Sequence, residues 1–420
     1  MHKQRPLKIT IFSEVLYGNG ASNAAFRLAH ALAKRGQIIL YLWSFGAKEG
    51  ENFPFFDRQI GLGPERYKLY QSYSKKSLLK KIIFRALEWF FRKIERREIR
   101  RILTAEKPDL INLHNVSALF DHEDIIELAG ETPIIWTLHD QYAFKQYHNQ
   151  YTNREGQEKT TWEYRFPGQL KPESLNKFKN SNANITFICP SQWLANGLKE
   201  TFGDKFPVHV LPNIFPSDNF IIMNPAEARQ KIKEERASVK GVLEIDPSDI
   251  VILFVSDRVQ NDLKNFKTLV EAVQILNNPK LKILPVGRAT EAYKATLPDF
   301  VLPIYYANTP EKIRWAYGAS NVVAVCSYIG NLPNVIVEGL LSGRPIVASK
   351  VGGIPEMFSE PEHGFFFDPT NPQDVAEKIR RALLQNYEPE TLRKYALEQI
   401  VNDSTVQRFE SLCLEKLASN

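Results

Sequence analysis

One pattern recurs along most of the sequence: a short apolar run that ends in polar residues, followed by a stretch with helical periodicity. Apolar runs of roughly four to eight residues are typical of buried strands. In the first half they occupy residues 7–13, 38–45, 109–115, 133–140, 184–191 and 208–213. Strands that alternate with helices indicate a parallel sheet covered by helices on both faces. The pattern therefore predicts an α/β chain of the doubly wound type.

The same pattern starts again after residues 214–225, which contain two prolines and no clear periodicity. Strands are expected over residues 249–255, 281–286, 321–326 and 346–349. A chain of 420 residues is also long for a single core. We therefore predict two Rossmann-like domains, residues 1–217 and 218–395. A C-terminal helix is expected over 396–420, with packing against the first domain as one option.

Composition places the chain among ordinary globular proteins, with 43% hydrophobic and 24% charged residues. No apolar run reaches the ~20 residues that span a bilayer, and residues 1–13 lead into a strand without a signal-type segment. The three cysteines, Cys189, Cys326 and Cys413, are far apart. Buried free thiols are the expected state, which favours a reducing, cytoplasmic location.

A basic segment over residues 66–101 carries thirteen Lys or Arg against three Glu. The segment is thus +10, which leaves −4 for the rest of a chain whose net charge is +6. A solvated helical face is one interpretation, and nucleic-acid binding finds no supporting motif. Leucine, isoleucine, tryptophan and phenylalanine residues interleave with the charges, as in helices that rest on anionic lipid. The segment therefore predicts contact with an anionic membrane surface.

Residues 327–356 combine a loop, a helix start and a glycine-rich turn directly after an expected strand. Gly330, Asn331 and Pro333 interrupt the apolar pattern, and Pro333 suits the first position of a helix. Backbone N–H groups at such a helix start can bind a phosphate or a sugar. Glu338, about one turn further on, can accept hydrogen bonds from vicinal hydroxyls.

This segment resembles the donor-binding end of family 4 retaining glycosyltransferases, which have the GT-B architecture. The family pattern has two glutamates separated by seven residues, then a glycine-rich turn with Pro-Glu. Glu338 matches the second glutamate, and Gly330 stands at the first acidic position, which the family places near the sugar ring. The resemblance implies a GT-B fold of two facing Rossmann-like domains. The donor-binding residues that it implies here are Gly330, Asn331, Leu332, Pro333, Asn334 and Glu338.

The loop at residues 18–22 (GNGAS) fails as a dinucleotide fingerprint, because Asn23 stands at its sixth position and no acidic residue follows about twenty positions on. On pattern alone it can be a plain strand–helix turn. The resemblance implies a glycine-rich loop in which Gly18 and Gly20 let the backbone approach the donor phosphates.

Arg258 and Lys264 follow the strand expected over residues 249–255 and can be solvated surface charges. The resemblance implies that they hold the diphosphate of a nucleotide sugar, where fixed cations stabilise the negative charge of the leaving group. There is no Asp-x-Asp triplet and no His/Cys cluster at ligand spacing, so we expect neither a metal ion nor a separate cofactor.

His139 ends an expected strand and can be a core histidine bonded to a carbonyl. It matches the histidine that faces the transferred sugar in the family. On the acceptor side we expect Asn115, Asp140, Tyr142 and His148.

The resemblance implies a retaining, metal-independent hexosyltransferase. Its donor would be a UDP- or GDP-sugar, and its acceptor a glycan or a lipid-linked saccharide of surface polysaccharide or glycolipid synthesis. The alternative is a catalytically silent GT-B relative that acts as a nucleotide- or glycan-binding scaffold. A nicotinamide-dependent oxidoreductase is disfavoured by the failed fingerprint.

Overall fold

The computed structural model describes residues 5–15, 20–45, 54, 56–62, 78–117, 120–145, 149–161, 172–236, 245–401 and 404–419. The chain forms two compact units. The first comprises Met1–Asn149, Thr160–Phe215 and Asp403–Asn420, and the second comprises Gln150–Lys159 and Pro216–Asn402. The first boundary thus lies two residues before the expected one. Residues 150–159, which we expected in the first domain, group with the second.

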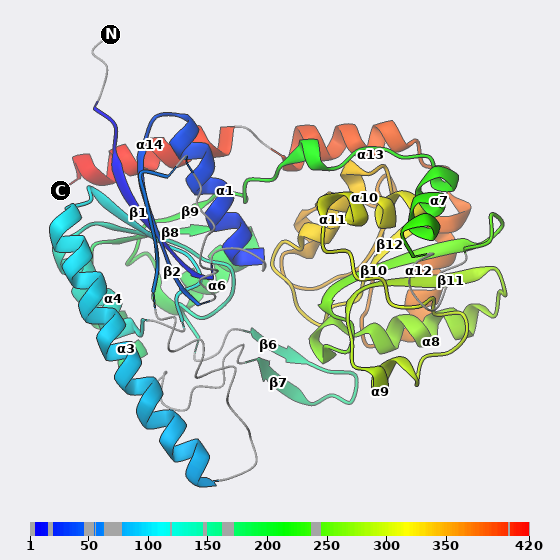
Figure 1. The fold of residues 1–420 in the computed structure, drawn as a ribbon, viewed down its shortest axis with the longest axis horizontal. Helices are drawn as coiled ribbons and strands as arrows, with labels where there is room; N and C mark the ends of the chain where they lie inside the picture. Colours follow the sequence, from blue (N-terminus) through cyan, green and yellow to red (C-terminus); the bar gives the residue numbers. More distant parts are fainter. Residues whose placement is uncertain are drawn as a thin grey trace. The chain divides into compact units, whose positions relative to one another are not determined.

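The first unit contains a seven-stranded, entirely parallel sheet in the order β3-β2-β1-β4-β5-β8-β9 (Figure 1). Its strands are β1 (Lys8–Val15), β2 (Ile38–Phe45), β3 (Arg58–Gly61), β4 (Leu110–Leu113), β5 (Ile134–Thr137), β8 (Ile185–Cys189) and β9 (Val208–Val210). The six apolar runs of the sequence all form strands. The edge strand β3 was not predicted, because its residues RQIG have no apolar run.

Helices cover both faces of this sheet. On one face α1 (Gly20–Lys34) and α14 (Ser404–Ala418) pack through side chains such as Leu28 and Phe409. On the other face lie α3 (Leu78–Glu106), α4 (His122–Glu131), α5 (Pro172–Asn180) and α6 (Gln192–Phe202). Ser191 caps α6 by accepting a hydrogen bond from the Leu194 N–H. Figure 1 shows α3 extending beyond the sheet of this unit.

The second unit contains a five-stranded parallel sheet in the order β11-β10-β12-β13-β14. Its strands are β10 (Ile250–Arg258), β11 (Leu281–Arg288), β12 (Val322–Val325), β13 (Ile346–Ser349) and β14 (Gly364–Phe367). Together the two parallel sheets with their helices confirm the predicted doubly wound α/β class.

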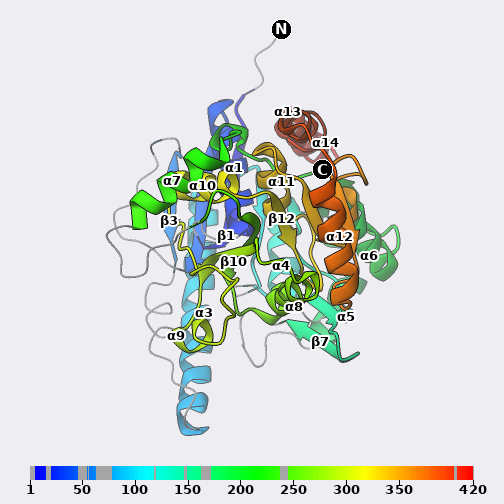
Figure 2. The same ribbon diagram turned by 90° about the vertical axis from the view of Figure 1, so that its right-hand side faces the viewer.

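Two helix pairs pack in the second unit, as Figure 2 shows: α8 (Phe266–Leu276) with α12 (Pro372–Leu384), and α7 (Pro225–Arg236) with α10 (Pro310–Ala319). Thr309 caps α10 by accepting a hydrogen bond from the Lys312 N–H. The second unit also contains the short helices α9 (Glu291–Lys294), α11 (Asn334–Leu341) and α13 (Pro389–Tyr395). We predicted Pro333 as the first residue of a helix, which is wrong by one position. Its backbone is extended, and α11 begins at the next residue, Asn334.

Candidate active site

The order of the second sheet singles out one position for a ligand. In terms of chain order the strands run 2-1-3-4-5, so the connections leave in opposite directions from the neighbouring strands β10 and β12. Ligands of doubly wound sheets bind outside the carboxyl ends of the strands at such a switch point. Arg258 ends β10, and the loop that starts at Ser327 follows β12. The residues matched by the resemblance therefore lie at the predicted ligand edge.

Arg258 presents a largely exposed guanidinium there, with its side chain 72% exposed. Asp257 lies beside it, with Oδ2 4.0 Å from Arg258 Nε, and also pairs with Arg288 at the end of β11. Lys264 ends a short 3-10 turn, Asp262–Lys264. The next residue, Asn265, has a left-handed backbone (φ 54), a conformation that asparagine tolerates better than most residues.

One backbone bond joins the loops after β10 and β12. The Tyr328 N–H donates to the Leu263 carbonyl at 3.0 Å, directly before Lys264. Further along the same loop, the Gly330 carbonyl accepts a bond of 3.0 Å from the Gly353 N–H. Gly352 has φ +59, and a Cβ there would lie 2.0 Å from the Gly330 oxygen. The loop after β12 is therefore held in place from both sides by backbone atoms.

Glu338 lies one turn into α11 and accepts a hydrogen bond of 2.6 Å from the Tyr317 hydroxyl. The Tyr317 ring is fully buried, and both burial and the neighbouring carboxylate raise the pKa of its phenol well above the ordinary value. The tyrosine therefore remains a hydrogen-bond donor and orients the glutamate. Sequence reasoning did not identify this partner, because Tyr317 lies on α10, 21 residues away.

Residues 149–161 form a hairpin of β6 (Asn149–Thr152) and β7 (Glu158–Thr161), which was not predicted. Tyr151 stacks on Tyr328, with ring centroids 5.5 Å apart and ring planes within 10°. Arg154 forms an ion pair with Glu271 on α8. The Tyr151 ring thus packs against the loop that follows β12.

In the first unit, His114 and His139 lie after the neighbouring strands β4 and β5. Their rings stack, and His114 Nδ1 is 2.9 Å from His139 Nε2. Burial is the main cause that lowers both pKa values, that of His139 to about 4 and that of His114 well below the ordinary range. Asp140 opposes the shift at His139, but burial dominates. Both rings are therefore neutral near pH 7.

Three of the predicted acceptor-side residues, Asn115, Asp140 and Tyr142, line a small pocket together with His139. Asp140 also accepts a bond of 2.9 Å from the Tyr142 N–H. The Tyr142 side chain is buried, and its hydroxyl donates to the Phe120 carbonyl at 3.0 Å. His148 lies outside the described residues.

At the start of α1, a Cβ added to Gly20 would meet no heavy atom of the described residues within 4 Å. The described part of the chain therefore does not itself require glycine at this position. Ser13 donates to Ser22 at 3.0 Å and ties the helix start to β1. Gly18 lies outside the described residues.

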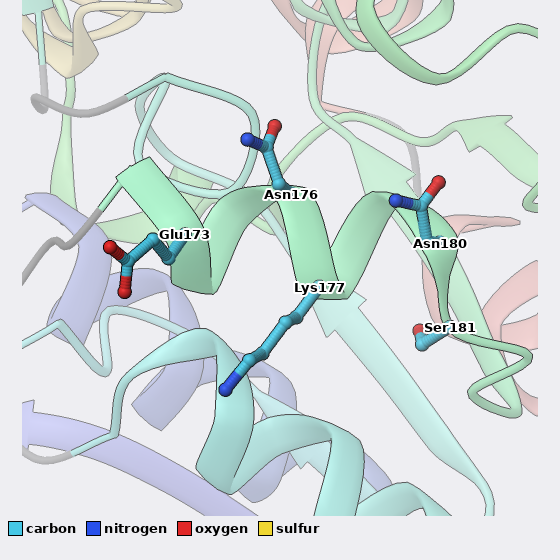
Figure 3. A pocket seen from close by; sticks show the side chains of 5 residues that line it. All are labelled: Glu173, Asn176, Lys177, Asn180 and Ser181. Atoms are coloured by element: carbon cyan, nitrogen blue, oxygen red, sulfur yellow. The ribbon is translucent and has the colours of Figure 1, made fainter.

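A shallow hollow over α5 lies elsewhere in the first unit (Figure 3). It is lined by Glu173, Asn176, Lys177, Asn180 and Ser181, and Lys177 pairs with Glu123 at 2.8 Å. Ser181 leads into the amino end of β8, the edge of the sheet opposite to the one where ligands bind. The hollow carries no candidate chemistry.

Among the described residues, no three His, Cys, Asp or Glu side chains lie close enough together to form a metal site. Of the described helices, none is both long enough and apolar enough to cross a bilayer.

The fold and site define a two-domain protein of the GT-B class, and comparisons with known proteins identify its family. A model described as Glycosyltransferase Family 4 matches residues 18–218, and one described as Glycosyl transferases group 1 matches residues 235–399. The chain belongs to glycosyltransferase family 4, as the resemblance predicts.

Curated relatives match over part of their length. A D-inositol 3-phosphate glycosyltransferase of Segniliparus rotundus is 30% identical over 172 residues, 38% of this chain and 37% of that protein. The Arabidopsis thaliana sulfoquinovosyl transferase SQD2 is 27% identical over 34% of this chain and 28% of its own length.

Solved structures match over nearly the whole chain. Sucrose-phosphate synthase from Thermosynechococcus elongatus has a TM-score of 0.72 at 18% identity and covers 98% of this chain and 99% of its own. Anabaena HepE, solved with UDP and glucose, has a TM-score of 0.63 at 16% identity and covers 97% and 99%. At these identities the likeness establishes the GT-B fold.

Proposed function

We propose that this glycosyltransferase is a retaining, metal-independent hexosyltransferase. Its donor is a UDP- or GDP-sugar, and its acceptor is a glycan or a lipid-linked saccharide on the cytoplasmic side of the cell. The observation that carries the proposal is the placement of Arg258, Lys264 and the loop before α11 at the carboxyl ends of two neighbouring strands. Anabaena HepE, which shares the fold, was solved with UDP-glucose and supports a nucleotide-sugar donor.

The proposed chemistry follows from the charges at this edge. The bond between the anomeric carbon and the diphosphate oxygen breaks, and the acceptor hydroxyl oxygen bonds to the same face of that carbon. The hydroxyl proton passes to the departing diphosphate. Arg258 and Lys264 stabilise the charge that develops on the diphosphate, so a metal ion is not required. Glu338, oriented by Tyr317, accepts hydrogen bonds from vicinal hydroxyls of the donor.

A donor screen followed by turnover measurements tests this proposal. UDP-, GDP- and ADP-sugars are compared for their effect on the melting temperature, since a ligand that binds the folded state raises it. The stabilising donor is then incubated with protein in EDTA, and release of nucleotide is measured. We expect slow hydrolysis that Arg258→Ala abolishes and that the exposed-site control Arg380→Ala leaves unchanged. Hydrolysis that persists in Arg258→Ala, or that requires an added metal, would contradict the mechanism.

Gly330 favours the alternative of a catalytically silent nucleotide-binding relative. A Cβ at this position would lie 3.3 Å from Ile354 Cδ1 and 3.4 Å from Pro333 Cγ, so a larger side chain would have to displace Ile354. Ile354 and Pro333 thus take up part of the space that a side chain would need at position 330, where the family has an acidic residue. Nucleotide binding without turnover of any donor would support this alternative.

We also propose that α3 contacts an anionic membrane surface. Leu87, Phe90 and Ile94 are exposed and follow each other at intervals of three and four residues, which places them on one face. Lys93 is exposed beside them, with Nζ 5.1 Å from the ring centre of Trp89. Apolar and aromatic residues flanked by cations are typical of helices that lie in the lipid interface. Residues 66–77 of the basic segment lie outside the described residues.

Flotation with phosphatidylglycerol vesicles at low salt tests the membrane contact. We expect wild-type protein to float and Phe90→Ser/Ile94→Ser to remain in solution. Leu384→Ser is the matched control, because Leu384 is 73% exposed on α12 and lies outside this face. Absence of wild-type flotation, or equal flotation of the double variant, would refute the contact.

A further inference from the structure

A chain of hydrogen bonds in the first unit leads from a main-chain carbonyl to His139. It starts at Asn112, whose Nδ2 is 3.0 Å from the Ile135 carbonyl oxygen and 3.0 Å from Thr137 Oγ1. A carbonyl oxygen can only accept, so the amide NH₂ must face Ile135. The amide oxygen of Asn112 therefore faces the other way, where His114 Nε2 lies 2.7 Å from it.

The amide oxygen determines the protonation of His114. Because this oxygen has no hydrogen, His114 Nε2 must be the donor of the 2.7 Å bond. His114 is only 2% exposed, and burial keeps its pKa well below the ordinary range, so its ring carries a single proton. That proton is on Nε2, which leaves Nδ1 with a lone pair 2.9 Å from His139 Nε2.

The lone pair of His114 in turn determines His139. A lone pair can only accept, so His139 Nε2 must carry a hydrogen. We propose that Asn112 and His114 are positioning residues that hold His139 in its Nε2–H tautomer, which leaves Nδ1 as an acceptor for a sugar hydroxyl. The tautomer follows from the hydrogen bonds alone, whereas its use on the sugar rests on the proposed function. The low pKa of His139, about 4, agrees with a neutral ring that accepts a bond instead of delivering a proton.

The arrangement has a consequence for substrate selection. A fixed acceptor binds a donor sugar that offers a hydroxyl at the matching position. A deoxy sugar would leave the lone pair without a partner, and sites that depend on a hydroxyl discriminate strongly against analogues that lack it. His139 would thus recognise one hydroxyl, and Asn112 and His114 would preserve that recognition without touching the sugar.

Nitrogen-15 NMR on protein labelled at histidine tests the tautomers directly, because two-bond correlations show which ring nitrogen carries hydrogen. We expect Nε2–H on both His114 and His139 in the wild-type protein. His122 is an internal reference outside this chain: its Nε2 is 3.0 Å from the Ala143 carbonyl, so it must also be the Nε2–H form. A wild-type His139 with its hydrogen on Nδ1 would overturn the inference, and this measurement requires no variant to fold.

Two substitutions of His114 test the positioning role. In His114→Asn the amide oxygen can take the place of Nδ1 and still accept from His139, whereas His114→Leu offers no acceptor. We expect the Nε2–H signal of His139 to persist in the first variant and to become a mixture of tautomers in the second. Donor kcat/KM should fall roughly tenfold in His114→Leu, the value of one net hydrogen bond, and much less in His114→Asn. An unchanged His139 tautomer in a folded His114→Leu would refute the role of His114.

The spectra and the kinetics also separate this inference from the proposed function. If no variant, including wild type, turns over a nucleotide sugar, the proposed function fails while the tautomer assignment still stands or falls on the spectra. If turnover occurs and the tautomer shifts in His114→Leu without any loss of kcat/KM, the contribution of Nδ1 to sugar recognition is refuted.

Discussion

Gly352→Ala tests how the loop after β12 is held. The residue has φ +59, and a left-handed backbone costs a residue with a Cβ roughly 1–2 kcal/mol. The new Cβ would also lie 2.0 Å from the Gly330 oxygen, whereas real Cβ contacts are essentially never below 3.0 Å, so the backbone must shift by about 1 Å. The shift disrupts the 3.0 Å bond from the Gly353 N–H to the Gly330 carbonyl, which contributes about 1 kcal/mol. We expect the free energy of unfolding to fall by about 2–4 kcal/mol.

Gly36→Ala is the matched control. Gly36 also has a left-handed backbone, with φ +85, but an added Cβ would meet no atom within 4 Å. This variant carries the backbone strain without the overlap, and we expect a loss of about 1–2 kcal/mol. Urea unfolding gives both values. Titration with the donor that stabilises wild type gives its affinity, which we expect to fall in Gly352→Ala alone. Donor kcat/KM should fall up to about 100-fold in this variant, since a displacement of about 1 Å can slow a reaction by that factor. Equal stability losses in the two variants, with donor affinity unchanged, would refute the described packing of Gly330.

Three further predictions concern buried polar groups. Tyr317→Phe removes the 2.6 Å bond to Glu338, so we expect an unfolding free energy lower by about 1.5–3 kcal/mol. We also expect weaker donor binding in calorimetry. If neither value changes, Tyr317 does not orient Glu338. The Arg344 guanidinium donates to the Tyr317 and Gly318 carbonyls, at 3.1 and 2.8 Å, at the end of α10. Arg344→Met removes both bonds, so urea unfolding should show a free energy of unfolding lower by about 2–4 kcal/mol. A decrease below about 1 kcal/mol would contradict this capping. His114 and His139 have lowered pKa values in the folded protein, so below about pH 6.5 the unfolded chain binds more protons than the folded one. The free energy of unfolding should therefore fall as the pH drops from 6.5 towards 4, by up to about 1.4 kcal/mol per pH unit for each histidine. An equally steep fall in His139→Gln would refute this cause.

The sequence alone determined most elements and their order along the chain. The apolar runs at residues 38–45 and 346–349 became β2 and β13 with the same bounds, because burial on both faces of a parallel sheet imprints a continuous apolar run on each strand. Ser191 and Thr309 marked helix starts for an equally local reason, since a capping side chain bonds to a backbone N–H only a few residues away. Short polar strands such as β3 and the β6–β7 hairpin left no such pattern. These strands could not be predicted from apolar periodicity.

The tertiary structure decided which side chains meet. Strand order brings His114 and His139 into contact although 25 residues separate them, and helix packing brings Tyr317 to Glu338. Gly352 illustrates the same limit, because its requirement for glycine comes partly from the carbonyl of Gly330 on another loop. Local periodicity reports whether a residue is buried, whereas its partner depends on sheet order and register, which are properties of the whole domain. The sequence therefore located the edge where we expect a ligand, and only the folded chain revealed the hydrogen bonds that orient the groups along it.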